Sequence, residues 1–496
     1  MQLSHYPGSV HYVCLTIALA TWSLAANSQG EGGFWTSPVW PEGPTQAQRD
    51  NMRLVGYNAL QARTAYYPEI KRQIVGGEER WIAYVGHHAG ESLNTLTGSV
   101  EQNGTSIVDV TDPRNPVYLH HIVPVAGSSG AQMARVCMGD ELPGGQAGRA
   151  YLLRAGASYH QVFDVTDPAA PELLSLIVDG LTDTHKTWWE CETGIAYLVS
   201  GVPGWRTDRM TQIYDLGNPS EPKFIRNFGL VGQQPGATGV APMELHGCIS
   251  VVARNRVYCG HGTAARGVFV ILDRDILIND LLVDSANPTA EELNAPVVGQ
   301  LRLPDYMGAH TTFPILGMQL EEFSNDEVIG QQDFVAIVNE QTRNECTDQA
   351  RQMMFMVEIT DESHPWPVST FNVPDASDDY CHRGGRFGAH GSNENFTPIY
   401  YGKLLFVTWF NAGVRAVDIR DPYNPIEVGY YVPGINENTA ERCITVAGQD
   451  QCKVAIQTNN VEVDDRGYIY LVDRANTGMH IVELTRRARR LAEFPD

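Results

Sequence analysis

The sequence predicts an all-β protein: a seven-bladed β-propeller whose ring is closed by an N-terminal strand in the last blade. Three observations predict this fold. A short unit of strands joined by an Asp-Pro turn recurs along the chain. Its copies are spaced by roughly 50 residues, a period typical of propellers and solenoids. About 470 residues follow a short apolar leader, which is enough for seven four-stranded blades.

The clearest copy of the unit covers residues 387–434. Its apolar segments are rich in Val, Ile, Phe and Tyr and are bounded by turn residues, so we expect short strands. Asp421-Pro422 followed by Asn424-Pro425 predicts a turn, because proline presets φ and the Asp and Asn side chains bond to nearby backbone groups. The other copies lie at residues 104–125, 160–178, 211–228, 267–275, 355–374 and 466–485.

The chain outside the copies has its own organisation. Residues 12–26 are a short apolar run followed by small residues, which is typical of a secretory signal peptide, although no Lys or Arg precedes the run. Segment 51–60 is apolar but has no unit of its own. We expect it to pair with the last copy, which lacks a fourth strand, and so to remove an exposed strand edge. The expected organisation is a signal peptide at 1–28, an N-terminal arm at 29–50, one propeller domain at 51–485 and a C-terminal tail at 486–496.

The charge and hydropathy of the chain exclude some functions. The formal net charge is −23 and the pI is close to 5.0. Nucleic-acid binding relies on Lys and Arg that neutralise phosphates, so we expect no nucleic-acid partner. Outside the leader no apolar run reaches the roughly 18 residues of a membrane-spanning helix, so we expect no transmembrane span.

Eight cysteines remain when Cys14 of the leader is left out. An even number is typical of an exported protein with disulfide bonds, and we expect a periplasmic or extracellular location. Cys443 and Cys452 bracket a short loop, and Cys248 and Cys259 flank an expected hairpin turn, so we predict these two pairs. No Cys-x-x-Cys spacing occurs, which disfavours a cysteine-bound metal.

The repeated Val-Asp-Val-x-Asp-Pro-x-x-Pro units resemble those of the LVIVD-repeat family of exported bacterial and archaeal proteins, which are predicted β-propellers. The segments MRLVGYNAL, WIAYVGHHAG and TSIVDVTDPRNP are similar to the usual beginning of that family. The resemblance covers nearly the whole chain after the leader. It implies the propeller fold but no particular activity, because one fold hosts many functions.

Four histidines occupy the same position in four consecutive copies. His185, His246, His310 and His390 each lie where the first strand of a blade is expected to begin. Since first strands line the centre of a propeller, we expect the four imidazoles to converge near its axis. Histidine is the usual ligand of Zn, Cu, Fe and Ni. The pattern therefore predicts a transition-metal site, with copper or iron favoured and zinc as a further possibility.

Other polar residues follow the expected second strands or lie close in sequence to the four histidines. Convergent polar groups are typical of a ligand site, and carboxylates commonly orient metal-bound histidines. We expect the following residues to orient the ligands or to bind a small-molecule substrate: His87, His88, Arg154, Glu190, Glu244, His261, Glu340, Asn411, Asn459 and Arg474.

Two functions stay open from the sequence. The first is an exported metal-dependent enzyme, an oxidoreductase or oxygenase that acts on a small organic substrate. The second is a non-catalytic binding module at the cell surface or in the periplasm, in which the recurring histidines are packing residues inherited with the repeat. No Gly-x-Ser-x-Gly, phosphate-binding glycine loop or His-Glu-x-x-His motif indicates another chemistry. The metal content of the purified protein would distinguish the two functions.

Overall fold

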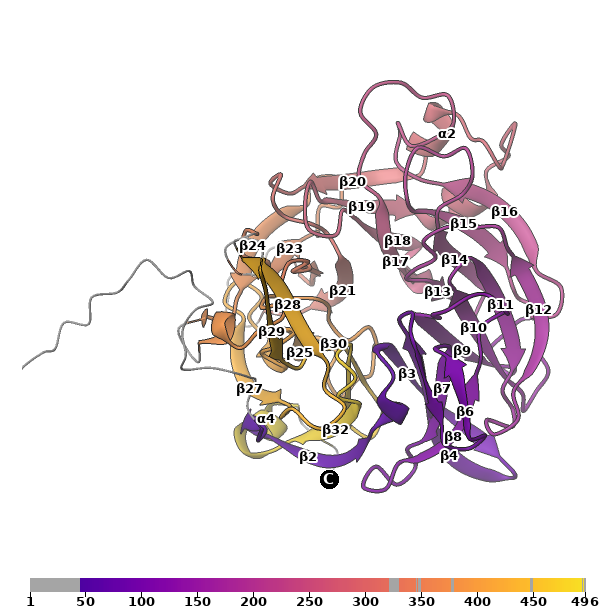
Figure 1. The fold of residues 1–496 in the computed structure, drawn as a ribbon. Helices are drawn as coiled ribbons and strands as arrows, with labels where there is room; N and C mark the ends of the chain where they lie inside the picture. The colour runs from indigo at the N-terminus through magenta and orange to yellow at the C-terminus, as the bar shows by residue number, and fades with distance from the viewer. Residues whose placement is uncertain are drawn as a thin grey trace, which may run out of the picture. The chain divides into compact units, whose positions relative to one another are not determined.

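A computed structural model describes residues 45–320, 330–344, 346, 349–375, 379–446, 449–492 and 494 of the chain. Within these ranges the strands form seven four-stranded antiparallel sheets arranged as the blades of a propeller (Figure 1). The predicted all-β fold and blade number are thus confirmed. The expected signal peptide and most of the expected arm lie outside the described residues, all of which belong to a single unit, Pro38–Asp496.

The first four blades follow the chain in order. Blade one contains β3 (Ala65–Val75), β4 (Glu78–His87), β7 (Thr105–Asp109) and β8 (Val117–Ile122). Blade two contains β9 (Met133–Met138), β10 (Ala150–Gly156), β11 (Tyr159–Asp164) and β12 (Glu172–Val178). Blade three contains β13 (Trp188–Trp189), β14 (Ile195–Ser200), β15 (Met210–Asp215) and β16 (Lys223–Phe228). Blade four contains β17 (Leu245–Val251), β18 (Arg256–His261), β19 (Val268–Asp273) and β20 (Val297–Arg302).

The last two blades borrow strands from the beginning of the chain. Blade five contains β21 (Thr311–Met318), β22 (Gln332–Val338), β23 (Met354–Glu358) and β24 (Trp366–Phe371). Blade six contains β25 (Leu404–Thr408), β26 (Val414–Asp418), β27 (Ile426–Val432) and β1 (Gln48–Asp50). Blade seven contains β30 (Thr458–Val463), β31 (Ile469–Asp473), β32 (Met479–Leu484) and β2 (Met52–Asn58).

The borrowed strands refine the expected domain boundaries. β2 pairs antiparallel with β32, with Met52 opposite Leu484. The effect of this pairing on the stability of the ring stays a prediction. Residues 48–50, which we assigned to an arm, instead form β1 and pair with β27. The assignment missed them because three polar residues carry no strand-like alternation.

Short hairpins and helices lie outside the seven blade sheets. Two hairpins project from the connections: β5 (Glu91–Asn94) with β6 (Ser99–Gln102), and β28 (Glu441–Val446) with β29 (Gln449–Val454). The helical pieces are α1 (Arg274–Asn279), α2 (Ala290–Asn294), α4 (Arg486–Leu491) and the 3₁₀ turns Leu60–Ala62, Val252–Arg254 and Tyr380–His382. The expected C-terminal tail thus begins as a helix, and its Ala488 packs into the core of blades six and seven.

In five blades an acidic residue at the end of one strand caps the turn to the next strand. Asp109 Oδ1 accepts a hydrogen bond from the Thr111 N–H over 2.8 Å, and Asp164 Oδ1 accepts one from the Thr166 N–H over 2.9 Å. Asp215, Glu358 and Asp418 accept the corresponding bonds in blades three, five and six. The aspartates of the Asp-Pro units bond in the same way: Oδ1 of Asp112, Asp167 and Asp421 each accepts from the N–H two residues on, which confirms the predicted turn mechanism.

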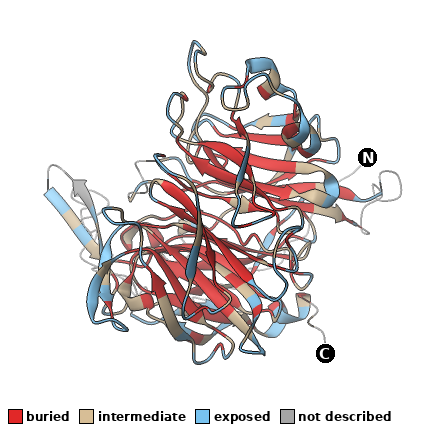
Figure 2. Ribbon diagram, turned by 90° about the vertical axis from the view of Figure 1, so that its right-hand side faces the viewer, coloured by how far each residue is buried: buried red, intermediate tan, exposed pale blue. Residues whose placement is uncertain are grey.

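The apolar core lies between neighbouring sheets. Strands in the middle of each blade are buried, as β14 is along its whole length, whereas the outer strand β12 has no fully buried residue (Figure 2). One cluster, for example, joins Ile82 of blade one to Leu152 of blade two. The helices among the described residues are too short and polar to cross a membrane.

Four disulfide bonds join cysteines of the described residues. Cys443–Cys452 and Cys248–Cys259 are the two predicted pairs, and both link neighbouring antiparallel strands. The other two bonds are Cys137–Cys191, between the inner strands of blades two and three, and Cys346–Cys381. The pairing of the last four cysteines had not been assigned from the sequence.

Candidate metal centre

The four histidines of the repeated position lie side by side at the inner ends of the blades. The ring centroids are 4.6 Å apart for His185 and His246, 3.4 Å for His246 and His310, and 4.6 Å for His310 and His390. All four residues are buried. We call this group the histidine cluster. The structure brings together all four histidines that the repeat singles out.

Equivalent backbone bonds explain why the four side chains meet. Three of the histidines donate their backbone N–H to a carbonyl oxygen of a neighbouring strand in the same blade, over 2.9–3.1 Å. These bonds run from His185 to Val199, from His310 to Val338 and from His390 to Thr408. His246 lies within β17 itself. The repeated pairing sets each histidine at the same end of its blade.

Several ring nitrogens of the histidine cluster lack the partners that buried imidazoles normally have. Among the described residues, Nδ1 of His185, Nδ1 of His246 and Nε2 of His310 have no hydrogen bond. His390 Nδ1 donates to the carbonyl oxygen of Asn459 over 2.7 Å, which leaves the lone pair on its Nε2. This arrangement is typical of metal-binding histidines, whose second nitrogen is fixed by a hydrogen bond. The free nitrogens are of the type that binds a transition metal, whereas the Nε2 atoms of His185 and His246 lie against each other at 2.9 Å.

Glu340 lies beside two members of the histidine cluster. Its carboxylate oxygens are 3.5 Å from His310 Nε2 and 3.9 Å from His390 Nε2. Potential ligand atoms of His310, Glu340 and His390 all lie within 4.8 Å of one another. Two imidazoles and one carboxylate are the ligand set typical of non-haem iron sites. We had expected Glu340 to orient ligands or bind substrate, and its position makes it a candidate ligand as well.

Burial keeps the histidine cluster in its neutral form. Burial lowers the pKa of His185, His246 and His310 well below the usual range, and neighbouring cationic groups lower it further. Burial also lowers the pKa of His390, to about 4, although the nearby Glu340 carboxylate opposes this shift. Burial alone would raise the pKa of Glu340, but His390 and three arginines lower it, so the carboxylate stays ionised. Neutral imidazoles and an ionised carboxylate are the forms that bind metals.

Tyr66 belongs to the site although the sequence analysis did not select it. Its hydroxyl lies 3.1 Å from His185 Nε2, and that nitrogen lies 2.9 Å from His246 Nε2. Tyr66 begins the first strand of blade one, the position that histidine occupies in blades three to six. Alignment of this first strand would have found it, but blade one has no histidine at that position. His88 packs edge-on against Tyr66, with ring centroids 5.1 Å apart.

The other expected polar residues divide into two groups. Asn459 and Arg474 lie at the site: Asn459 accepts from His390, and Arg474 is 3.7 Å from Glu340. Within the described residues, no side-chain hydrogen bond or ring contact joins His261 or Glu244 to the four rings. Glu244 accepts a hydrogen bond from the Thr263 hydroxyl over 3.1 Å.

The second group supports the blades and makes no contact with the histidine cluster within the described part of the chain. His87 bonds Ser106, Arg154 donates to the carbonyl oxygens of Ile122 and Val123, and Asn411 donates to those of Tyr380 and Gly384. Glu190 pairs with Arg274 between blades three and four. A role for these four residues in orienting ligands or binding substrate stays a prediction, and their side chains bond within the blades because a strand end fixes a height in the blade but not the direction of a side chain.

A second polar group lies further along the same inner strands. Arg135 and Lys186 form ion pairs with the fully buried carboxylate of Glu394. Tyr67 donates to Glu462 over 2.5 Å and accepts from Arg135 over 2.8 Å. We call these five residues the axial charge cluster. The Thr311 hydroxyl joins it to the histidine cluster, at 3.0 Å from Lys186 Nζ and 3.1 Å from His310 Nδ1.

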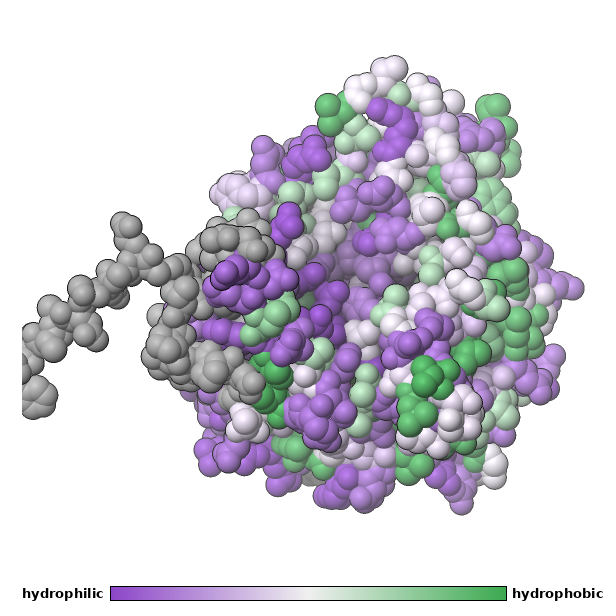
Figure 3. All heavy atoms as spheres, viewed as in Figure 1, coloured by the Kyte–Doolittle hydropathy of each residue, from purple (hydrophilic) through white to green (hydrophobic). Residues whose placement is uncertain are grey.

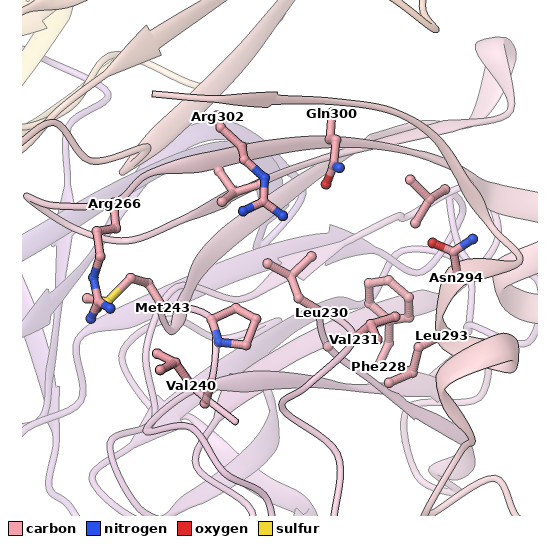
Figure 4. A pocket seen from close by; sticks show the side chains of 15 residues that line it. Phe228, Leu230, Val231, Val240, Met243, Arg266, Leu293, Asn294, Gln300 and Arg302 are labelled. Carbon is pink, nitrogen blue, oxygen red and sulfur yellow. The ribbon is translucent and has the colours of Figure 1, made fainter. Parts of the chain in front are cut away.

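Two cavities lie outside the histidine cluster. One of about 190 Å³ is lined by Tyr67, Arg135, Glu394 and Glu462 and therefore opens onto the axial charge cluster. Another of about 500 Å³ lies between the end of β16, the loop before β17 and β20. Figure 4 shows the guanidinium of Arg302 directed into this larger cavity. Neither cavity contains a residue of the histidine cluster.

Comparison with known proteins adds little beyond the fold. No family model matches the sequence, and no curated protein is similar enough to count as a relative. Among 413 matching chains of solved structures is hydrazine synthase of Kuenenia stuttgartiensis. The two chains share 9% sequence identity, with a TM-score of 0.47, and the match covers 87% of this chain and 97% of the other.

Proposed function

We propose that the protein is an exported enzyme that uses a transition metal, bound by the histidine cluster, to oxidise or oxygenate a small organic substrate. The observation that carries this proposal is the packing of four neutral, buried imidazoles, three of which have a ring nitrogen without a hydrogen bond among the described residues. Such nitrogens cost stability unless a ligand satisfies them. Four disulfide bonds support export, since disulfides persist in oxidising compartments. Membership of the LVIVD-repeat family is likewise a proposal, which the repeat units support.

The ligand types favour iron or copper over zinc. His310 and His390 would supply nitrogen ligands and Glu340 an oxygen ligand, since their ligand atoms lie within 4.8 Å of one another. His185 and His246, whose rings lie next to these, would supply further nitrogen ligands. A structural zinc site relies mainly on cysteine, and no thiolate lies in this set; a catalytic zinc accepts histidine and glutamate ligands but has no redox chemistry of its own. Bound iron or copper would supply Lewis-acid or redox chemistry.

The residues of this chain would hold and shield that chemistry. Asn459 fixes the His390 ring through its Nδ1 proton, so Nε2 faces the site. Phe410 packs on His390, with ring centroids 5.0 Å apart, and both residues are buried, which limits access of water from that side. The Tyr66 hydroxyl, at 3.1 Å from His185, is placed to donate a hydrogen bond to a group that binds in the site.

The metal content of the protein tests the proposal. Wild type and the four single alanine variants of the histidine cluster are purified after export and analysed for metals per chain. We expect about one iron or copper per wild-type chain and a loss of most of it in His310→Ala and His390→Ala. The control is His364→Ala, which removes an exposed histidine paired with Asp361 at the surface. Thermal unfolding of each variant checks that the blades remain folded.

Two outcomes would contradict the proposal. Wild-type protein that holds no metal and cannot be reconstituted with iron or copper would overturn the enzyme proposal. Full metal occupancy in all four alanine variants would overturn the assignment of the ligands. In either case the non-catalytic binding module becomes the preferred function, with the histidines as packing residues.

A further inference from the structure

Two arginines from different blades converge on the carboxylate beside the histidine cluster. Arg386 Nη1 lies 2.7 Å from Glu340 Oε1, and Arg474 Nη1 lies 3.7 Å from the same oxygen. Arg386 precedes the inner segment of blade six, and Arg474 follows the second strand of blade seven. Among the described residues, no other carboxylate lies within 4 Å of either guanidinium. One glutamate is therefore the ion-pair partner of two arginines.

The same two guanidiniums lie close to the histidines. Their central carbons are 5.3 Å and 5.9 Å from the centroid of the Phe410 ring, for Arg386 and Arg474 respectively. Phe410 in turn contacts His390. The Phe410 ring thus lies between both arginines and the candidate metal ligand His390. Figure 3 shows hydrophilic side chains around a hollow near the middle of the face in view.

The arginines are held together at an electrostatic cost. Arg386 and Arg474 share one carboxylate and both lie against the Phe410 ring, so their positive charges are close together. Arg442 adds a third positive charge, since its guanidinium donates a hydrogen bond of 2.6 Å to the Arg474 carbonyl oxygen. Like charges that are partly buried destabilise a fold unless a counter-charge is present. This concentration is unusual in a chain whose net charge is −23.

Glu340 alone cannot balance these charges when a metal is bound. Its second oxygen faces His310, and a metal held by the histidine cluster would draw on the same carboxylate. The guanidiniums of Arg386 and Arg474 would then keep donors without a partner. Arginine presents several N–H donors in a planar fork that matches a carboxylate, so an anionic ligand would satisfy them.

We propose that the substrate of this site is a small organic anion whose carboxylate binds Arg386 and Arg474. Calling this anion a substrate rests on the proposed function, whereas the anion site itself requires only the two arginines. The anionic group would bind at the guanidiniums, and the remainder of the molecule would extend toward the histidine cluster. This orientation places the reactive end of the substrate, and not its carboxylate, at the metal.

The test measures binding of simple carboxylates and of their neutral amides. Acetate and benzoate are compared with acetamide and benzamide by calorimetry, at constant ionic strength, on wild-type protein with and without added metal. We expect at least one carboxylate to bind about tenfold or more tightly than its amide, since charge-assisted hydrogen bonds are the stronger kind. Arg474→Met and Arg386→Met should weaken that binding by about tenfold or more. Retention of fold is checked by thermal unfolding.

The control variant is Arg302→Met. Arg302 is an exposed arginine without an ion pair among the described residues, but it lines the separate large cavity. It should leave carboxylate binding unchanged. The anion proposal is overturned when neither carboxylate binds either form of the protein, when amides bind equally well, or when both arginine variants bind like wild type. Arginine-dependent binding to a protein that holds no metal would support the anion site while removing the proposed metal function, so the two failures are distinguishable.

Discussion

The histidine cluster and the axial charge cluster lie on the same inner strands but satisfy their polar groups in opposite ways. In the axial charge cluster, Arg135 donates to the Thr187 carbonyl, to Tyr67 and to Glu394. Glu394 also pairs with Lys186. In the histidine cluster, one ring nitrogen in each of three histidines has no hydrogen bond among the described residues. Buried polar groups without partners are rare in folded proteins and indicate either a ligand or a functional strain.

The difference separates a structural group from a candidate site. His185 and Lys186 are neighbours in sequence, yet the first contributes to an unsatisfied cluster and the second to an ion-paired one. Burial alone therefore does not identify function on this axis. The hydrogen-bond state and the convergence of the rings together do, because His160 and His261 also have unpartnered ring nitrogens but make no ring contact with the histidine cluster among the described residues. Three substitutions test this distinction.

Glu394→Gln should have the largest effect on stability. The substitution leaves Arg135 and Lys186 buried without their shared negative charge, and breaking a buried ion pair costs about 3–5 kcal/mol. We expect a loss of that size in the free energy of unfolding measured with urea. The control is Glu141→Gln, which removes the exposed pair with Lys71 and should cost less than about 1 kcal/mol. Equal effects of the two substitutions would show that the axial charge cluster does not stabilise the fold.

Glu340→Gln should act on the metal more than on the fold. The amide keeps the shape of the side chain but removes the charge that faces His310 and His390. Loss of a group that supports metal ligands typically lowers metal affinity by about 10–100-fold. Competition with a chelator of known affinity would measure the change. The control is Glu244→Gln, a nearby glutamate whose carboxylate accepts from Thr263. Wild-type affinity in Glu340→Gln would exclude the carboxylate from the metal centre.

The sequence predicted the blades because their information is local. The acidic residues that cap the turns, such as Asp109 and Asp164, bond to a backbone group two residues away, so each copy shows its own turn. The short strand β1 escaped prediction because its three polar residues show no strand pattern, and its partners in β27 lie 380–384 positions away. The Cys137–Cys191 bond was missed for a related reason: it joins two blades.

The histidine cluster was predictable because a repeated position in the sequence becomes a repeated position in space. The axial charge cluster was not, since its residues occur once each and meet only across the ring. Arg135 and Glu394 are 259 residues apart, and Tyr67 and Glu462 are 395 residues apart. Tyr66 shows the limit of the repeat argument: it holds the histidine position in blade one with a different side chain. A repeated position in the sequence predicts where a side chain lies in the ring but not which residues it contacts.

The smallest expected effect is the pH dependence that Glu462 contributes. Burial and the neighbouring Glu394 carboxylate together raise the pKa of Glu462 to about 8, although its hydrogen bond from Tyr67 opposes this shift. In the unfolded chain this carboxyl titrates near its usual value of about 4.3, so above that pH the folded protein holds a proton that the unfolded chain has lost. The stability from this group is therefore present in full below about pH 4.3 and is lost as the pH rises to about 8.

Glu462→Gln removes the ionisation, so wild type should lose about 1–2 kcal/mol relative to the variant between pH 6.5 and pH 8.5, as measured by urea unfolding. The buried histidines do not disturb this comparison, because their lowered pKa values place their contribution below pH 6.5 and the variant retains them. Parallel curves for the two proteins across this range would show that Glu462 is ionised in the fold, and the axial charge cluster would then hold one more unbalanced negative charge than the structure indicates.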